Sequence, residues 1–381
     1  MKRITIEERP WWQEQARDLG FRFHTIDGEK YWDESAYYQF SLKQVENDIE
    51  DVTQELHELA MALVDEVVAS EQKLEQLCIP ERHWDLVATS WRQRQPHLYG
   101  RMDFSYDGAA PAKLLELNYD TPTSLYESGF FQWLWLEDAI KHDMVPKGSD
   151  QFNSLQEQLQ SRFGELGVER LHFASVQNSD EDLGTVRYLQ DIASQASLAT
   201  RYVPMEQIGF GDGHFWDRED QAIDAIFKLY PWEFMLAEEF GDLIAGSQTL
   251  WLEPPWKIIL ANKGILPLLW QAHKGHPNLL EAHFDDGSAL GRGWVKKPIF
   301  SREGANVELY LPDGQRLAEP GPYDDGRFIR QALAPLPAFA GNHTLLGSWV
   351  VGDVACGMGI REDSSLITKD SARFVPHIIS E

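Results

Sequence analysis

The sequence predicts a mixed α/β fold, and three patterns indicate it. Residues 43–77 place apolar side chains at spacings of three and four, the period of an amphipathic helix. Residues 101–120 contain two segments separated by a glycine-containing turn, and the second alternates apolar and polar positions as a half-buried strand does. Residues 151–230 follow a strand–helix–strand order, which favours a parallel sheet. Helices and at least two kinds of strand pairing are therefore expected in one chain.

The expected elements follow from the same patterns along the chain. Ser124 and Glu127 have the spacing of a capping box, which predicts a helix just before an apolar stretch. Gly352 and Asp353 form a hairpin signal between two strand-like segments. In chain order we expect a helix over 43–77, strands over 101–107 and 113–120, a helix including 130–136, a helix over 152–166, a strand over 171–175, a helix over 180–196, strands over 199–204, 222–229, 294–300 and 307–311, and a hairpin over 344–359.

The composition is that of a folded protein with an acidic balance. Of 381 residues 43% are hydrophobic, and fourteen Trp and nineteen Phe supply a core, which excludes wholesale disorder. The net charge of −27 disfavours binding to nucleic acid or to an anionic membrane through a general basic surface. It is compatible with a cationic substrate or partner, although solubility alone also explains it.

Cysteine usage and hydropathy point to an intracellular setting. Cys78 and Cys356 lie far apart and argue against a disulfide framework or a cysteine-based zinc site. No run of about 18 apolar residues occurs, and the N-terminus lacks the apolar segment of a secretory signal. We therefore expect a cytoplasmic protein.

The first candidate site is a pair of polar motifs on the two strands of 101–120. Strand alternation places Arg101 and Asp103 on one face, and Glu116 and Asn118 together on one face. If the strands pair, three oxygen ligands of the kind that Mg²⁺ prefers converge beside a guanidinium that could neutralise phosphate. The alternative is an edge hairpin with a solvated polar face.

A segment of hydroxyl residues follows directly. Thr121, Thr123 and Ser124 stand at an expected helix start, where hydroxyls and free backbone N–H groups attract anions such as a substrate carboxylate. Ordinary helix capping is the alternative.

Three further segments carry charges. Lys263 and Lys297 could neutralise nucleotide phosphates, and the small-residue loop 301–306, with Gly304, could close over them; lysines at strand ends are also commonly solvated. Arg361 follows a glycine-rich segment and could reach a transferring phosphoryl group, or could pair locally on a surface loop. Acidic residues open a helix at 180–182, where they also suit the helix dipole, and could instead hold an amine; beside aromatic residues, Glu233 offers another carboxylate.

In their order along the chain these motifs resemble the glutathionylspermidine synthase family, and more narrowly its stand-alone bacterial members, described as acid–amine ligases. The resemblance covers residues 10–381. It is carried by Arg101-Met-Asp103, by the segment from Leu114 to Glu127, by Asn262-Lys-Gly-Ile-Leu-Pro, by the segment from Lys297 to Asn306 and by Gly359-Ile-Arg-Glu-Asp363.

The resemblance implies an ATP-grasp fold and ATP-dependent formation of an amide. ATP would phosphorylate a carboxylate, and an amine would displace phosphate from the acyl phosphate. Within 10–381, the resemblance implies a metal-binding hairpin and helix over 101–136, an α/β substrate-side unit over 151–230 and a nucleotide-binding unit over 250–381. The cofactor would be Mg²⁺, as two ions with ATP.

Site roles carry over residue by residue. Arg101 would stabilise the phosphoryl-transfer transition state, with Arg361 as a second candidate. The expected metal ligands are Asp103, Glu116 and Asn118; the expected ATP contacts are Arg101, Met102, Asp103, Lys263, Lys297, Gly304 and Gln331, the last near the base; the candidate substrate contacts are Thr121, Thr123, Ser124, Glu181, Asp182 and Glu233. For the general base, Asp182, Glu181 and Glu233 remain open.

Departures from the family pattern leave the substrates open. The bifunctional relatives carry an amidase domain for which this chain has no room, so no amidase activity is expected. The segments 121–124 and 228–233 differ from those of the glutathionylspermidine-forming members. The acid could be glutathione or another peptide, and the amine a polyamine. Two alternatives remain: a peptide ligase that uses an amino acid as the amine, and a non-catalytic ATP-binding regulatory protein on the same fold.

Overall fold

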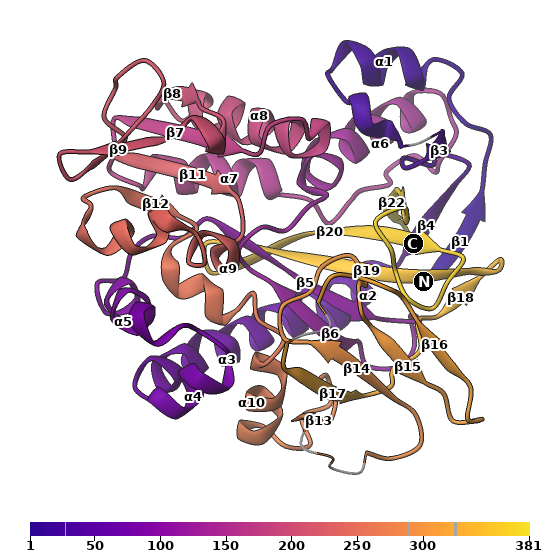
Figure 1. The fold of residues 1–381 in the computed structure, drawn as a ribbon. Coiled ribbons are helices and arrows are strands. Elements are labelled where there is room, and N and C mark those ends of the chain that lie inside the picture. The colour runs from indigo at the N-terminus through magenta and orange to yellow at the C-terminus, as the bar shows by residue number, and fades with distance from the viewer. Residues whose placement is uncertain (27, 286, 288–289, 324–325) are drawn as a thin grey trace.

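The structure, a computed structural model, describes residues 1–26, 28–285, 287, 290–323 and 326–381. It confirms the mixed α/β fold. A long hairpin, β19–β20, crosses the centre of the molecule, with a parallel sheet on one side of it and a five-stranded antiparallel sheet on the other (Figure 1).

The central sheet is antiparallel and carries the expected 101–120 hairpin as β5 and β6. Its strand order is β21-β20-β19-β5-β6, and β18 also pairs with β19. Its strands are β5 (Tyr99–Ser105), β6 (Lys113–Asn118), β18 (Ala338–Phe339), β19 (Asn342–Val351), β20 (Val354–Asp363) and β21 (Arg373–Val375). The predicted turn at Gly352 and Asp353 joins β19 to β20, with Gly352 at a φ of 58°.

The parallel sheet confirms the strand–helix–strand reading. Its order is β12-β11-β7-β8, built from β7 (Arg170–Ser175), β8 (Ala199–Tyr202), β11 (Ala225–Leu229) and β12 (Leu250–Leu252). Two helices pack against each other in this region, α7 (Leu155–Gly164) and α8 (Asp180–Gln195). The sheet extends beyond residue 230, because β12 pairs in parallel with β11.

The five-stranded sheet has the order β13-β17-β14-β15-β16. Its strands are β13 (Ala282–Phe284), β14 (Trp294–Pro298), β15 (Glu308–Tyr310), β16 (Arg316–Ala318) and β17 (Phe328–Ala332). Two of them, β14 and β15, confirm the strands predicted over 294–300 and 307–311.

The helix α3 (Asp51–Val68) packs against β19 and β20 of the central sheet, and two expectations about the helices need correction. The helix expected over 43–77 is interrupted at residues 69–70, because Ser70 leaves helical geometry and caps the next helix by accepting a hydrogen bond from the Lys73 N–H. The capping box at Ser124 and Glu127 does not form: Ser124 has a φ of 68°, and its hydroxyl contacts Tyr31 instead of the helix backbone. The helical elements here are α2 (Leu42–Val45), η2 (Glu46–Glu50), α3 (Asp51–Val68), α4 (Glu71–Gln76), η3 (Glu81–His83), α5 (Trp84–Arg92), η4 (Glu127–Phe131), α6 (Gln132–Lys141), η7 (Pro255–Ile259) and α10 (Ile265–Ala272).

A small sheet brings the two ends of the chain together. Its order is β1-β4-β22, from β1 (Lys2–Thr5), β4 (Ala36–Phe40) and β22 (His377–Ile379), and β22 runs parallel to β4. The remaining elements are α1 (Trp12–Asp18), η1 (Arg22–His24), β2 (Thr25–Ile26), β3 (Glu29–Lys30), η5 (Met205–Gln207), β9 (Gly209–Gly211), β10 (His214–Trp216), α9 (Trp232–Met235) and η6 (Glu239–Gly246). In the described part of the chain, no helix has both the length and the apolar character that a membrane crossing requires.

Candidate active site

The polar residues of β5 and β6 meet as the alternation predicted. Arg101 lies opposite Asn118, and Asp103 opposite Glu116. The Arg101 guanidinium donates two hydrogen bonds to the Asp103 carboxylate, at 2.6 and 3.0 Å. The Asn118 amide nitrogen lies 3.1 Å from Asp103 Oδ2 and 3.3 Å from Glu116 Oε1. Three oxygen-bearing side chains and one cation therefore share one face of the hairpin.

Both candidate lysines reach this face from more distant segments. Lys263 Nζ lies 3.1 Å from Glu116 Oε2 and donates to the backbone oxygen of Ser301 at 2.6 Å. Lys297 Nζ donates to Gln331 Oε1 at 2.9 Å and to a backbone oxygen of β6. Gln331 in turn donates to the backbone oxygen of Leu114 at 3.1 Å. Polar contacts of Lys297 and Gln331 thus join the five-stranded sheet to the β5–β6 hairpin, which carries the candidate metal ligands.

Burial and neighbouring charges shift the pKa values of the site residues. Although burial opposes ionisation, the ammonium groups of Lys263 and Lys297 lower the pKa of Glu116 to about 2. Burial raises the pKa of Asp103 in spite of the Arg101 guanidinium. Burial also lowers the pKa of Lys297 to about 8, although Glu116 favours its charged form. Near pH 7 Glu116 is therefore an anion that an additional cation would stabilise.

A pocket with an empty volume of about 830 Å³, its open mouth included, lies beside these groups. It combines a polar wall with apolar side chains from the five-stranded sheet and nearby loops. The polar and glycine lining is Asp103, Glu116, Lys263, Lys297, Glu303, Gly304 and Gln331, and the apolar lining includes Val295, Val307, Leu309, Leu333, Leu345, Leu366 and Ile367. Such a lining suits a ligand with a flat apolar ring system and an anionic end.

Gly304 stands where the loop 301–306 passes close to another segment. Its φ is 71°, and a Cβ there would lie 2.7 Å from Ile367 Cγ2 and 2.8 Å from the backbone oxygen of Thr368. Only glycine fits this left-handed, crowded position without a shift of the backbone. The backbone of the loop 301–306 therefore packs directly against Ile367 and Thr368, which also line the pocket.

Arg361 lies beside Arg101 across a smaller space. Both line a space of about 240 Å³ together with Ser124 and Ser128. One Arg361 nitrogen, Nη2, donates to backbone oxygens of residues 369, 370 and 372. Met102, by contrast, points into the core on the opposite face of β5 and is fully buried there. The structure thus groups the two arginines but separates the Met102 side chain from them.

The substrate candidates fall into two groups. Arg302 donates to Thr121 Oγ1 at 2.7 Å and to Glu233 Oε1 at 2.6 Å, and these three residues line one small pocket. This contact of Arg302 was not predicted, because it joins segments more than 60 residues apart. Thr123 contributes its backbone oxygen, which accepts a 2.6 Å hydrogen bond from Arg101.

The second group lies at the start of α8. Burial, followed by the charge of Glu127, raises the pKa of Glu181 to about 8. Burial also raises the pKa of Asp182. With a pKa of about 8, Glu181 is mostly protonated near pH 7.

The donor set on β5 and β6 fits Mg²⁺. Two carboxylates and one amide converge, and all are hard oxygen ligands of the type that Mg²⁺ uses. The Asn118 amide nitrogen points at both carboxylates, and rotation of the amide by half a turn would present its oxygen instead. We propose Asp103, Glu116 and Asn118 as the residues that would hold the metal.

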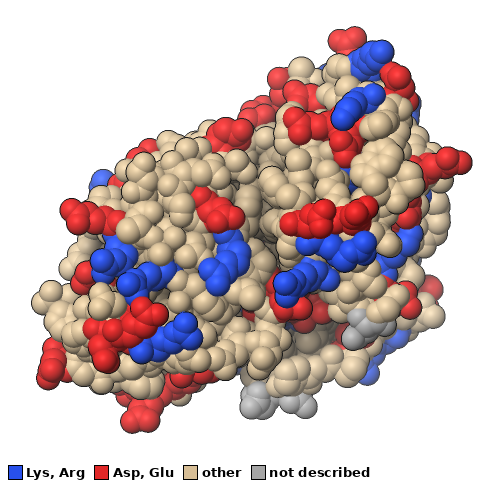
Figure 2. All heavy atoms as spheres, turned by 90° about the horizontal axis from the view of Figure 1, so that it is seen from above, with Lys and Arg blue, Asp and Glu red and all other residues tan. Residues whose placement is uncertain are grey.

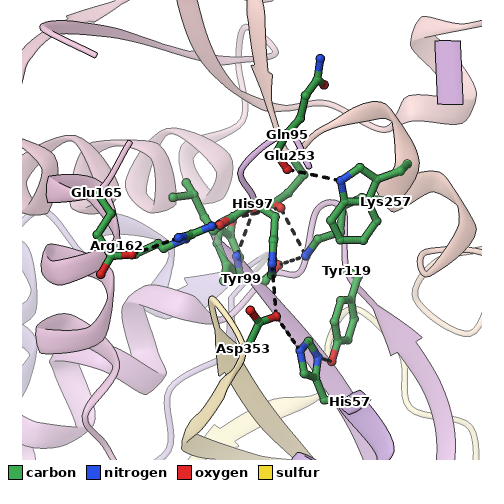
Figure 3. Close-up of polar contacts among 12 residues, drawn as sticks. His57, Gln95, His97, Tyr99, Tyr119, Arg162, Glu165, Glu253, Lys257 and Asp353 are labelled. Carbon is green, nitrogen blue, oxygen red and sulfur yellow. Dashed lines mark hydrogen bonds and ion pairs between the residues drawn. The ribbon is translucent and has the colours of Figure 1, made fainter. Parts of the chain in front are cut away.

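Two buried charged residues, Glu253 and Lys257, bind the backbone at the start of β5, outside the candidate site (Figure 3). Glu253 accepts the backbone N–H groups of Leu98 and Tyr99 at the start of β5, while Lys257 donates to the backbone oxygen of Tyr99 at 2.9 Å and lies 3.3 Å from Glu253. Lys257 also lies 4.6 Å from the ring centre of Tyr119, next to Asn118. The ends of β5 and β6 that carry the site are therefore tied to η7.

The same cluster reaches the tip of the β19–β20 hairpin (Figure 3). His57 contacts the Tyr119 hydroxyl at 3.0 Å and Asp353 at 3.0 Å, and His97 lies 3.4 Å from the same carboxylate. Hydrogen bonds from the two histidines lower the pKa of Asp353, while burial lowers the pKa of His97 to about 4. The cluster thus joins the hairpin tip to β6 from outside the site.

Figure 2 shows one face of the molecule, on which acidic and basic side chains are intermingled and a hollow separates two parts of the molecule. This face therefore offers no broad basic surface for a polyanion.

Comparisons with known proteins place the chain among amide-forming ligases. Residues 3–380 match the family described as glutathionylspermidine synthase preATP-grasp. A Haemophilus influenzae protein named "Putative acid–amine ligase" is 39% identical, with 99% of each chain covered. Trypanothione synthetase of Crithidia fasciculata is 29% identical over 82% of this chain and 52% of its own length. The bifunctional glutathionylspermidine synthetase/amidase of Escherichia coli is 24% identical over 97% of this chain and 63% of its own.

A solved structure supports the fold. A glutathione synthetase-like effector of Globodera pallida, in its apo form, superposes with a TM-score of 0.57 at 14% identity and covers 98% of both chains. At this identity the likeness concerns the fold alone, and it agrees with the ATP-grasp architecture expected above.

Proposed function

The chain belongs to the glutathionylspermidine synthase family of ATP-dependent acid–amine ligases, and from this premise we propose that it joins a peptide-like acid to an amine through an acyl phosphate. The observation that carries the proposal is the convergence of Asp103, Glu116 and Asn118 with Lys263 and Lys297 beside one pocket. Phosphoryl transfer needs positioning and charge neutralisation more than a covalent nucleophile, and this arrangement supplies both.

Each group has a proposed task in the first half-reaction. The pocket would hold ATP, with its base near Gln331 and its phosphates beside Lys263 and Lys297. The loop at Gly304 would cover the phosphates through its backbone N–H groups. Asp103, Glu116 and Asn118 would hold Mg²⁺, which would supply positive charge to neutralise the phosphates. Arg101 and Arg361 would stabilise the charge that develops as the phosphoryl group moves to the acid.

The second half-reaction needs an amine near the acyl phosphate. The positive charge of a bound polyamine would favour the ionised forms of Glu181 and Asp182 at the start of α8, so these two carboxyl groups are our proposed contacts for the amine. The hydroxyls of Thr121 and Ser124 and the Arg302 guanidinium would contact the acid substrate. A glutathione-like acid and a spermidine-like amine are therefore our proposed substrate classes.

A peptide ligase that uses an amino acid as the amine is the second candidate function, and the position of Arg302 favours it. A nucleophile with its own carboxylate needs a cation near the amine, and Arg302 lies there on Glu233. The acidic start of α8 favours a polyamine instead, because a second carboxylate would be repelled by it.

The decisive experiment measures ADP and phosphate release with Mg²⁺ across a matrix of acids and amines. Glutathione, short peptides and amino acids serve as acids; spermidine, putrescine and amino acids serve as amines. We expect release to require both an acid and an amine, with an amide product in the mass spectrum. ATP binding without release for any pair would contradict catalysis and favour a regulatory protein.

A further inference from the structure

Glu127 is a buried carboxylate that the proposed nucleotide and metal contacts leave unused. It opens η4, it is fully buried, and neither carboxylate oxygen has a hydrogen-bond partner among the described residues. An ionised carboxylate isolated in a protein interior is costly, so such groups are paired, protonated or held for a ligand. Glu127 therefore has capacity to accept a proton or a cation that the described residues do not use.

The surroundings of Glu127 connect it with the space where the acyl phosphate would form. The charged and titratable groups that act on it, or on which it acts, are Tyr31, Arg101, Tyr126, Glu181 and Arg361. The Tyr31 hydroxyl lies 3.0 Å from Ser124 Oγ, and Ser124 lines the space between the two arginines. The Tyr31 hydroxyl thus contacts Ser124 at the edge of that space and interacts electrostatically with the Glu127 carboxylate.

We propose that Glu127 accepts the proton that the amine must lose before it attacks, an inference that rests on the proposed ligase function. The amine arrives as an ammonium, and one of its protons passes to the Glu127 carboxylate by way of Ser124 and Tyr31. Its freed lone pair forms the C–N bond to the acyl carbon while the C–O bond to phosphate breaks. A second proton leaves the nitrogen with the departing phosphate, so the products are the amide, hydrogen phosphate and protonated Glu127.

The other carboxylates of the region are less suited to this step. Glu233 is bound to Arg302 at 2.6 Å, and a paired carboxylate is a weaker base. Glu181 and Asp182 lie at the partly exposed start of α8 and can attract the amine and return the proton to solvent. Glu127 is fully buried, and its carboxylate interacts electrostatically with Arg101 and Arg361, the two arginines that line the space where the acyl phosphate would form.

The test uses the isosteric variant Glu127→Gln and two nucleophiles. The wild-type protein is first assayed with glutathione and spermidine, or with the pair from the matrix above that gives the highest rate. Hydroxylamine is the second nucleophile, because it is largely unprotonated at neutral pH and needs no base before it attacks. We expect the variant to form amide about 10² to 10⁴ times more slowly. It should form hydroxamate from the same acid at the wild-type rate.

The pH dependence provides a second readout. Amide formation by Glu127→Gln should climb with pH as more of the free amine is present, whereas wild-type activity should depend less on pH. Glu165→Gln, which removes an exposed carboxylate paired with Arg162 outside the site, is the matched control and should leave both reactions unchanged.

The possible outcomes separate this proposal from its premise. No ADP from the wild-type protein with any pair would refute the ligase function itself. A Glu127→Gln variant that forms amide at the wild-type rate, or that loses hydroxamate and amide formation together, would refute the role of Glu127. The melting temperature of the variant should equal or exceed that of the wild type, because no hydrogen-bond partner of the carboxylate is lost.

Discussion

Gly347 on β19 provides the space in which Arg101 lies, and Gly347→Ala tests how finely that arginine must be placed. A Cβ at this position would lie 2.8 Å from Arg101 Cδ, whereas ordinary contacts begin at 3.4 Å, so the side chain must move by about 0.6 Å. The guanidinium is anchored at its far end by Asp103 and by the backbone oxygen of Thr123, so a shift at Cδ disturbs those bonds.

The expected loss is a reduction of kcat by roughly 10- to 100-fold, because small misplacements of a group that acts in the transition state cost rates of this order. That range corresponds to about 1.4–2.7 kcal/mol in activation free energy. The overpacked sheet should also lose about 1–3 kcal/mol of stability. The assay is ADP release at saturating ATP together with a denaturant melt, and the KM for ATP should change little.

Gly357→Ala on β20 is the matched control. A Cβ there would lie 2.8 Å from Leu155 Cγ, in the core and away from the arginine. It should cost a similar amount of stability while kcat stays at the wild-type value. Equal losses of kcat in both variants, or an unchanged kcat in Gly347→Ala, would show that the placement of Arg101 by this glycine has no part in catalysis.

Three further predictions concern the charged groups of the site. Asp103→Ala and Glu116→Ala should each abolish ADP release while circular dichroism shows the fold retained; wild-type turnover in both would remove the metal assignment. The affinity of the free protein for ATP should fall as pH rises through about 8, because burial lowers the pKa of Lys297 to that value and its positive charge is lost above it. ATP-binding titrations of Lys297→Met across the same pH range should lack this fall. The same fall in the variant would disprove the assignment to Lys297. Arg302→Ala should leave Glu233 without its 2.6 Å partner and raise the KM of the acid substrate more than that of ATP, and steady-state kinetics in which only the KM for ATP rises would contradict this.

Local sequence pattern was sufficient where the partners are close along the chain. The hairpin of β5 and β6 joins neighbouring segments, so alternation was sufficient to predict which side chains share a face, and the structure adds the register that sets Arg101 opposite Asn118. The long β19–β20 hairpin was predictable for the same reason. The break at Ser70 was missed because the apolar period continues across it, although a serine that can cap a helix was the available signal.

Tertiary contacts decided what the sequence pattern left open. The contact between Arg302 and Glu233 joins a loop to α9, and no local period indicates it. Glu127 has the spacing of a capping residue, yet η4 packs against β20 and buries its carboxylate, so its environment depends on a strand more than 200 residues later. The roles of the site residues stay predictions until the variants above are measured.

The pairing of β4 with β22 can form only late in the synthesis of the chain. Tyr38 pairs with His377, so 339 residues separate the two partners. At roughly 5–20 residues per second, the ribosome needs about 17–68 s between them. During that interval β4, whose residues 36–38 and 40 are buried in the finished protein, has β1 on one side and an open edge on the other. Nascent chains should therefore be most prone to unwanted strand pairing, and most dependent on chaperones, until the last strand emerges.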